Sequence, residues 1–288
     1  MVDSLAAPFD AQERNWSLPE SGEVLCYHQP GAGRPVLLLH SINAAPSAYE
    51  MRPFVTSMSL GRPMFIPDLP GFGRSQRGDR AYTAELFATA VIEMIEEIGG
   101  GAVDVVALST TSELVARAAL MRPELFSSLT IVSPTGFSRR RSGPNPTGDR
   151  ARRILSTPVL GAGLFRLLRS RSSVRWFLNM GFRDKAPEAM VDYACATAAQ
   201  PGASFAPFYF LSGALFAADA VGELYQPLKL PVLVLYDRDP NISFDYLSEV
   251  EGMPNWTLVR IPKTLGLPQF EEPELTEQAI QNFWSSVG

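Results

Sequence analysis

The chain has 288 residues, enough for one large domain with a sizeable buried core. Hydrophobic residues make up 46% of the chain and charged residues 19%, a composition that is typical of a globular protein and excludes a disordered one. The net charge is −5 and the pI is about 5.2, so the chain lacks the basic character of a nucleic-acid-binding domain.

Cysteine and histidine are scarce, with two of each. Cys26 and Cys195 lie far apart in the sequence, and His28 and His40 are the two histidines. This set offers no zinc-ligand spacing, so we expect no metal site and no cofactor. No apolar run is long enough to cross a bilayer, and the first twenty residues lack the features of an export signal. We therefore expect a cytoplasmic protein.

Short apolar runs alternate with helical patterns along the chain. The runs occupy 23–28, 35–40, 63–68, 103–109, 127–133, 231–237 and 256–262. The helical patterns occupy 45–58, 82–98, 110–121 and 273–286. Several runs are continuously apolar, as expected of strands that are buried on both faces. The alternation predicts the α/β class, with a doubly wound, mostly parallel central sheet flanked by helices.

The alternation stops between about 138 and 225. This segment has helical patterns and no convincing strand, and residues 157–182 read as two amphipathic helices. We predict a helical lobe over 138–225, inserted into a core that is formed by 1–137 and 226–288.

The first part of this lobe is strongly basic. Residues 139–175 contain ten arginines and one acid, Asp149, which gives the stretch a charge of +9 and leaves −14 for the remainder. Either the arginines form a solvated face and cover apolar surface with their stems, or they attract an anionic group on a substrate, a membrane surface or an acidic partner. A nucleic acid is a weaker candidate than any of these partners, because no nucleic-acid recognition motif is present.

Ser109 stands between a strand pattern and a helical pattern. The apolar run VDVVAL ends immediately before it, and TTSELVARAAL follows it. A serine on such a turn lifts its hydroxyl above the edge of the sheet, where the following helix offers backbone N–H donors to an oxyanion. This is the geometry of a nucleophile elbow.

Five segments, in the same order, resemble those of capped α/β-hydrolase-fold proteins. They are the loop at His40, DLPGFGRS at 68–75, the elbow at 107–111, YDRDP at 236–240 and GLPQFEEPELTEQAIQNFW at 266–284. The resemblance covers nearly the whole chain and implies the α/β-hydrolase fold.

The resemblance also implies a role for individual residues. Ser109 would be the nucleophile and Asp239 the acid, while the backbone amides of Ile42 and Thr110 would form the oxyanion hole. The lobe at 138–225 would be a cap, and the pocket would lie between cap and core, beneath Ser109. The aromatic residues of the lobe would supply part of an apolar lining.

The chain departs from the family pattern at two places. The elbow has Ala-Leu-Ser-Thr-Thr at 107–111 in place of G-x-S-x-G, so we expect a more relaxed turn. The tail normally reads G-H-x-P-x-x-E-x-P, but here Gly266 stands at the position of the catalytic histidine. Losing one triad member costs on the order of 10⁴- to 10⁶-fold in rate, because the serine has no proton acceptor. An ordinary Ser-His-Asp mechanism is therefore disfavoured.

Two side chains are candidates for a substitute base. His40 is the one imidazole near the expected pocket, although the resemblance favours a structural role for it in its loop. Lys263 would need burial to lower its pKa. His28 lies in the first strand, where we expect a structural role.

Three functional classes remain open. The chain is a hydrolase with a substitute base, a lyase, isomerase or cyclase on the same fold, or a non-catalytic ligand binder similar to the plant hormone receptors of this fold. We favour an enzyme that acts on a mainly apolar small molecule with a carbonyl or ester-like group, with Gly266 among the binding residues. The reason is that Ser109 and two backbone donors still stabilise an enolate or a tetrahedral oxyanion.

Overall fold

A computed structural model describes residues 5–58, 60–139 and 158–287 of the chain. Its eight strands form one sheet. They are β1 (Gln12–Leu18), β2 (Gly22–Gln29), β3 (Val36–Leu39), β4 (Met64–Pro67), β5 (Val103–Leu108), β6 (Phe126–Val132), β7 (Val232–Arg238) and β8 (Trp256–Leu265). Seven strands coincide with the predicted apolar runs. The sequence missed β1, because its residues are mostly polar and exposed at the edge of the sheet.

The strands are ordered β1-β2-β4-β3-β5-β6-β7-β8. β2 pairs antiparallel with both β1 and β4, and all other neighbouring pairs are parallel. The predicted α/β class with a mostly parallel sheet is therefore confirmed. In such a sheet the carboxyl ends of the parallel strands meet at one edge, where a site is normally assembled.

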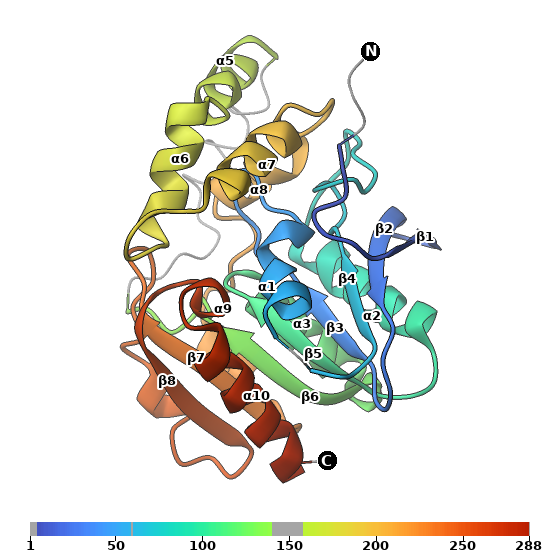
Figure 1. Cartoon of the computed structure of the whole chain (residues 1–288), viewed down its shortest axis with the longest axis vertical. Coiled ribbons are helices and arrows are strands. Elements are labelled where there is room, and N and C mark those ends of the chain that lie inside the picture. The colour runs from blue at the N-terminus through green and yellow to red at the C-terminus, as the bar shows by residue number, and fades with distance from the viewer. Residues whose placement is uncertain (1–4, 59, 140–157, 288) are drawn as a thin grey trace.

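Helices cover both faces of the sheet (Figure 1). They are α1 (Arg52–Thr56), α2 (Ala84–Ile98), α3 (Thr111–Met121), α9 (Pro268–Glu271) and α10 (Pro273–Val287), with short helical turns at Ala48–Met51, Pro123–Leu125, Val221–Tyr225 and Leu247–Glu249. Alternate residues of a strand enter opposite cores, as the pleat requires. In β3, for example, Leu37 and Leu39 pack on the side of α2 and α3, while Val36 and Leu38 pack on the side of α1 and α10.

Four helices lie beyond one end of the sheet (Figure 1). They are α5 (Pro158–Leu168), α6 (Arg171–Met180), α7 (Glu188–Ala198) and α8 (Phe205–Leu211), and we call them the cap helices. α5 and α6 are the two amphipathic helices that the sequence predicts. The division into a core and a cap at 138–225 stays a prediction, since 140–157 fall outside the described residues. None of the described helices is both long and apolar enough to span a membrane.

The N-terminal segment contacts the cap helices. Leu5 is buried, and Phe9 packs edge-on against the ring of Tyr27, with 5.3 Å between the ring centroids. Tyr193, on α7, donates a hydrogen bond to the carbonyl of Ala6 at 2.8 Å, and its ring lies 5.1 Å from that of Tyr49. The first described residues therefore join the core to the cap helices.

A buried carboxylate, Asp68, organises the loop that follows β4. It accepts hydrogen bonds from the backbone N–H groups of Ala48 and Arg74, both at 2.8 Å, and from the hydroxyl of Tyr27 at 3.3 Å. Gly73 lies so close to this carboxylate that a β-carbon there would collide with it. Asp68 thus joins three chain segments beside the carboxyl edge of the sheet.

We predict that Asp68→Ala destabilises the fold by roughly 3 kcal/mol or more, because three donors inside the protein lose their acceptor. Urea unfolding followed by circular dichroism measures the change. Asp79→Ala, which removes an exposed carboxyl group from the same loop, serves as the control and is expected to leave the midpoint unchanged. Equal midpoints for both variants would contradict this role of Asp68.

Candidate active site

Ser109 occupies a strained turn between β5 and α3. Its φ angle is +55°, in the left-handed region that non-glycine residues rarely adopt. Its N–H donates to the carbonyl of Val132 at 2.8 Å, and its own carbonyl accepts from the N–H of Ser112 at 3.0 Å. The expectation of a relaxed turn is therefore wrong: the elbow keeps its conformation although both flanking glycines are absent.

Thr111 explains how the elbow tolerates a β-branched side chain. It is fully buried, and its hydroxyl donates to the backbone carbonyl of His40 at 2.7 Å. This hydrogen bond ties the turn that carries Ser109 to the loop after β3. A glycine at 111 would lack this hydroxyl, so in this chain a tertiary contact supports the strained turn.

The loop after β3 carries the predicted oxyanion donor Ile42. Buried Glu50 holds this loop, since it accepts from the N–H of Ser41 at 2.8 Å and from the side-chain amide of Asn43 at 3.0 Å. Within the described part of the chain, neither the N–H of Ile42 nor that of Thr110 has a protein acceptor. Both donors are thus available to a carbonyl oxygen in the cavity described below.

The structure places His40 outside the cavity wall, away from the other predicted site residues. Its ring is fully buried and is absent from the cavity wall. Nδ1 donates to the carbonyl of Ser41 at 2.6 Å, and Nε2 accepts from the N–H of Leu69 at 2.9 Å. Burial lowers the pKa of His40 to about 4. Both ring nitrogens are engaged, so the imidazole has a structural role.

Lys263, the other candidate base, and His28 also lie away from the cavity. Lys263 is exposed on β8 and does not line the cavity, so the burial that a lysine base requires is missing. His28 lies on β2, where its ring lies within 3.2 Å of the side chains of Arg14 and Gln12. His28 does not line the cavity, and its structural role stays a prediction.

Asp239 and Gly266 lie against each other. A β-carbon placed on Gly266 would lie 2.7 Å from Oδ2 of Asp239, and the φ angle of Gly266 is +103°, which favours glycine. The carboxyl group of Asp239 accepts from the N–H groups of Asn241 at 2.7 Å and Ile242 at 3.1 Å. Burial nevertheless raises the pKa of Asp239 to about 6, because these two hydrogen bonds only partly compensate the desolvation.

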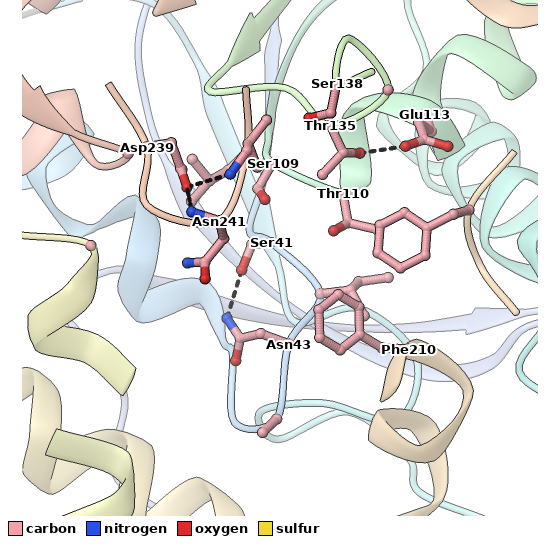
Figure 2. Close-up of a pocket in the computed structure, with 18 of the residues that line it drawn as sticks. Ser41, Asn43, Ser109, Thr110, Glu113, Thr135, Ser138, Phe210, Asp239 and Asn241 are labelled. Carbon is pink, nitrogen blue, oxygen red and sulfur yellow. Dashed lines mark hydrogen bonds between the residues drawn. The ribbon is translucent and has the colours of Figure 1, made fainter. Parts of the chain in front are cut away.

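One cavity of about 600 Å³ brings the predicted site residues together (Figure 2). Its wall includes Ser109, Thr110, Ile42, Asp239 and Gly266. The cap helices add an apolar roof, to which Leu168, Val174, Phe177, Leu178, Met180, Phe210 and Leu211 contribute. The expected pocket beneath the helical lobe is therefore present, with Ser109 in its wall.

Two buried acidic residues of the cavity wall escaped the sequence analysis. Glu50 and Glu113 are both buried, and burial raises the pKa of each. The sequence does show Glu113 as the one acid in the helix that follows Ser109. Without knowledge of the burial, such an acid reads as an ordinary first-turn residue of a helix.

The cavity wall is acidic rather than basic. Its carboxyl-bearing residues are Glu50, Glu113, Asp219, Asp239 and Glu249, and no described residue of the wall is Lys, Arg or His. An anionic group is therefore not matched by any described side chain in the cavity.

The basic stretch at 139–175 is only partly described. Arg140, Arg141, Arg150, Arg152 and Arg153 fall outside the described residues. Within the cap helices, Arg171 pairs with Asp192 and, at 2.8 Å, with Glu188, while Arg175 lies 2.7 Å from Glu188. Part of the positive charge is therefore neutralised inside the cap, and attraction to an anionic partner stays a prediction.

Known proteins share this arrangement. The model of a family described as the alpha/beta hydrolase family matches residues 36–279, which include six of the eight strands and the elbow. The chain belongs to the alpha/beta hydrolase family. No curated protein matches the sequence significantly.

Solved structures of similar overall shape include those of three enzymes. A serine hydrolase involved in carbazole degradation is 18% identical, with 96% of this chain and 99% of that chain covered and a TM-score of 0.75. An esterase from Thermogutta terrifontis is 20% identical, with 96% and 99% covered and a TM-score of 0.70. An epoxide hydrolase from an endophytic Streptomyces is 17% identical, with 96% and 95% covered and a TM-score of 0.74. At these identities the likeness shows the fold.

We predict that Asp239→Asn stabilises this α/β hydrolase at pH 8 and has almost no effect at pH 4. The raised pKa means that the folded protein favours the protonated carboxyl group, so stability is lost as pH rises from about 4 through about 6. Asparagine removes the buried charge and its Oδ1 still accepts both backbone hydrogen bonds, with a gain on the order of 2 kcal/mol. Chemical unfolding at the two pH values tests this, with Asp219→Asn, at an exposed position of the cavity wall, as the control.

We also predict that Gly266→His does not restore an ordinary triad. The new β-carbon would meet Oδ2 of Asp239, and histidine disfavours the φ angle of this position. Hydrolysis of p-nitrophenyl acetate should stay within a few-fold of the wild-type rate, while the melting temperature falls.

Leu267→His is the matched control for this experiment, because it adds an imidazole to the same cavity wall at a position without these two constraints. A gain of several orders of magnitude in the Gly266→His protein alone would contradict the prediction. It would show that Asp239 moves aside and supports a histidine.

Proposed function

We propose that this α/β hydrolase is an enzyme that moves a proton at the carbon next to a carbonyl group of a mainly apolar small molecule, as lyases, isomerases and cyclases do. The observation that carries the proposal is the pairing, in one cavity, of two backbone donors with an acidic side chain that no histidine accompanies. The elbow conformation of Ser109 supports it.

The backbone donors would stabilise an enolate. Ile42 and Thr110 line the cavity, and their N–H groups have no protein acceptor among the described residues. Helix α3 begins directly after Thr110. A carbonyl oxygen bound there would accept both hydrogen bonds, which strengthen as negative charge develops on the oxygen. The hydroxyl of Ser109 would add a third, adjustable donor.

Asp239 would accept the proton. With a pKa of about 6, about nine-tenths of its carboxyl groups are ionised at pH 7, and the remaining acidity suits the return of the proton to the product. A carboxylate combined with an oxyanion hole is a known solution for proton abstraction beside a carbonyl group. The same carboxylate is a poor acceptor for a serine hydroxyl proton, so acyl transfer through Ser109 is disfavoured.

The apolar roof indicates the kind of substrate. The cavity of about 600 Å³ fits a small organic molecule, and the side chains of the cap helices that line it are mostly aliphatic or aromatic. The acidic residues of the wall favour a neutral or cationic molecule over an anionic one.

A second candidate is a non-catalytic binder. The missing histidine and the closed position of Gly266 against Asp239 favour it, because a receptor needs the cavity and not the base. In that case the cavity would bind a carbonyl compound and leave its protons in place.

Deuterium exchange tests the proposal. The protein is incubated in D₂O with 4-phenyl-2-butanone, a neutral apolar ketone, and the loss of the α-proton signals is followed by NMR. We expect exchange above the buffer rate, rising with pH through about 6 to a plateau, because the active form of Asp239 is ionised. Asp239→Asn should remove both the acceleration and the pH dependence.

The other outcomes identify the alternatives. Binding of the ketone without exchange in the wild type would support the non-catalytic binder. Rapid stoichiometric labelling of Ser109 by a fluorophosphonate would instead support a hydrolase whose serine is activated by a base. Exchange that is equal in the wild type and in Asp239→Asn would show that Asp239 is not the proton acceptor.

A further inference from the structure

Glu113 stands out as a buried acid with an incomplete set of partners. It lies in the first turn of α3, one helical turn after Ser109, and only 2% of its surface is exposed. Oε1 accepts from the hydroxyl of Thr135 at 2.5 Å, and Oε2 accepts from the N–H of Ala217 at 2.8 Å. Both partners are uncharged, and no described cation forms an ion pair with Glu113.

A carboxylate that accepts hydrogen bonds from two uncharged donors inside a protein lowers the stability of the fold, because its charge is removed from water. Its two oxygens offer about four acceptor positions, of which two are used here. Burial of a carboxyl group without a cationic partner costs stability, and a neutral glutamine would satisfy the same two groups at lower cost. Glu113 is one of the residues that line the cavity.

The surroundings of Glu113 suit the far end of an aromatic ligand. Figure 2 shows Glu113 and Asp239 on opposite sides of Ser109, with Thr110, Thr135 and Phe210 on the side of Glu113. The rings of Phe210 and Phe216 lie 5.6 Å apart and both line the cavity next to Ala217. An aryl group placed against these rings would direct a polar substituent towards Glu113.

We propose that Glu113 is a specificity-determining residue that binds a hydroxyl or amine donor on the ligand, at the end of the molecule away from its carbonyl group. The substrate class is then a neutral or cationic carbonyl compound with a hydrogen-bond donor on a remote aryl group. This inference rests on the proposed function for the position of the carbonyl group. Burial raises the pKa of Glu113, and its hydrogen bonds to Ala217 and Thr135 and the charge of Arg117 only partly oppose this effect.

Three matched ketones test the proposal by isothermal titration calorimetry. They are 4-(4-hydroxyphenyl)-2-butanone, which has a donor, its 4-methoxy analogue, which has only an acceptor, and the unsubstituted 4-phenyl-2-butanone. We expect the wild type to bind the hydroxyl compound about tenfold more tightly than the methoxy compound, since a buried charged acceptor discriminates by about this factor. Equal affinities in the wild type would overturn the proposal.

Two variants at Glu113 and one control locate the effect. Glu113→Gln keeps both protein contacts, because its amide donates to the hydroxyl of Thr135 and its oxygen accepts from Ala217, while Glu113→Leu removes every acceptor. The preference should shrink in the first variant and vanish in the second, with folding of each checked by its melting temperature. Glu249→Gln makes the same acid-to-amide change at an exposed position of the cavity wall and should keep the tenfold preference. A preference that survives in Glu113→Leu, or is lost in Glu249→Gln, would overturn the role of Glu113.

The same titrations in Asp239→Asn separate the two proposals. One outcome is that Asp239→Asn keeps the preference for the hydroxyl compound, while neither this variant nor the wild type accelerates proton exchange. This outcome would support Glu113 as the specificity-determining residue and contradict the proposed function. The other outcome is proton exchange that depends on Asp239, without a preference for the hydroxyl compound. This outcome would support the proposed function and contradict the role of Glu113. If none of the three ketones binds, both proposals fail.

Discussion

The hydrogen bond from the hydroxyl of Thr111 to the carbonyl of His40 is the contact on which the geometry of the site depends. It joins the turn that carries Ser109 and Thr110 to the loop that carries Ile42, so it fixes the position of Thr110 relative to Ile42. The ring of His40 extends the same connection to the loop after β4, through Leu69. His40, which the sequence suggests as a candidate base, therefore connects three loops through hydrogen bonds of its backbone carbonyl and its ring.

Asp239 and Gly266 constrain each other through direct contact. The carboxyl group of Asp239 lies against the place where a side chain at 266 would begin, and the backbone there has a conformation that suits glycine. Asp239 is thereby left partly desolvated, and burial raises its pKa to about 6.

Apolar runs and turn residues were enough to predict the sheet, because strands buried on both faces leave an uninterrupted signal, as in Val103–Leu108. β1 escaped because an edge strand with a polar, exposed face carries no such signal. The conformation of the elbow was predicted wrongly, because its support is a hydrogen bond to a residue 71 positions away. Glu50 and Glu113 were missed for a similar reason, since the burial that makes them unusual is a property of the packed molecule.

The hydrogen bond between Tyr193 and the carbonyl of Ala6 connects the N-terminal segment with α7, one of the cap helices. The N-terminal segment lies beside the cap helices, whereas the C-terminus lies at the opposite end of the molecule (Figure 1). An affinity tag at the N-terminus would therefore be attached close in sequence to the segment that connects the core with the cap helices. A tag at the C-terminus would be attached far from this segment. The position of the tag thus decides whether ligand binding is measured with the contact between the N-terminal segment and the cap helices undisturbed.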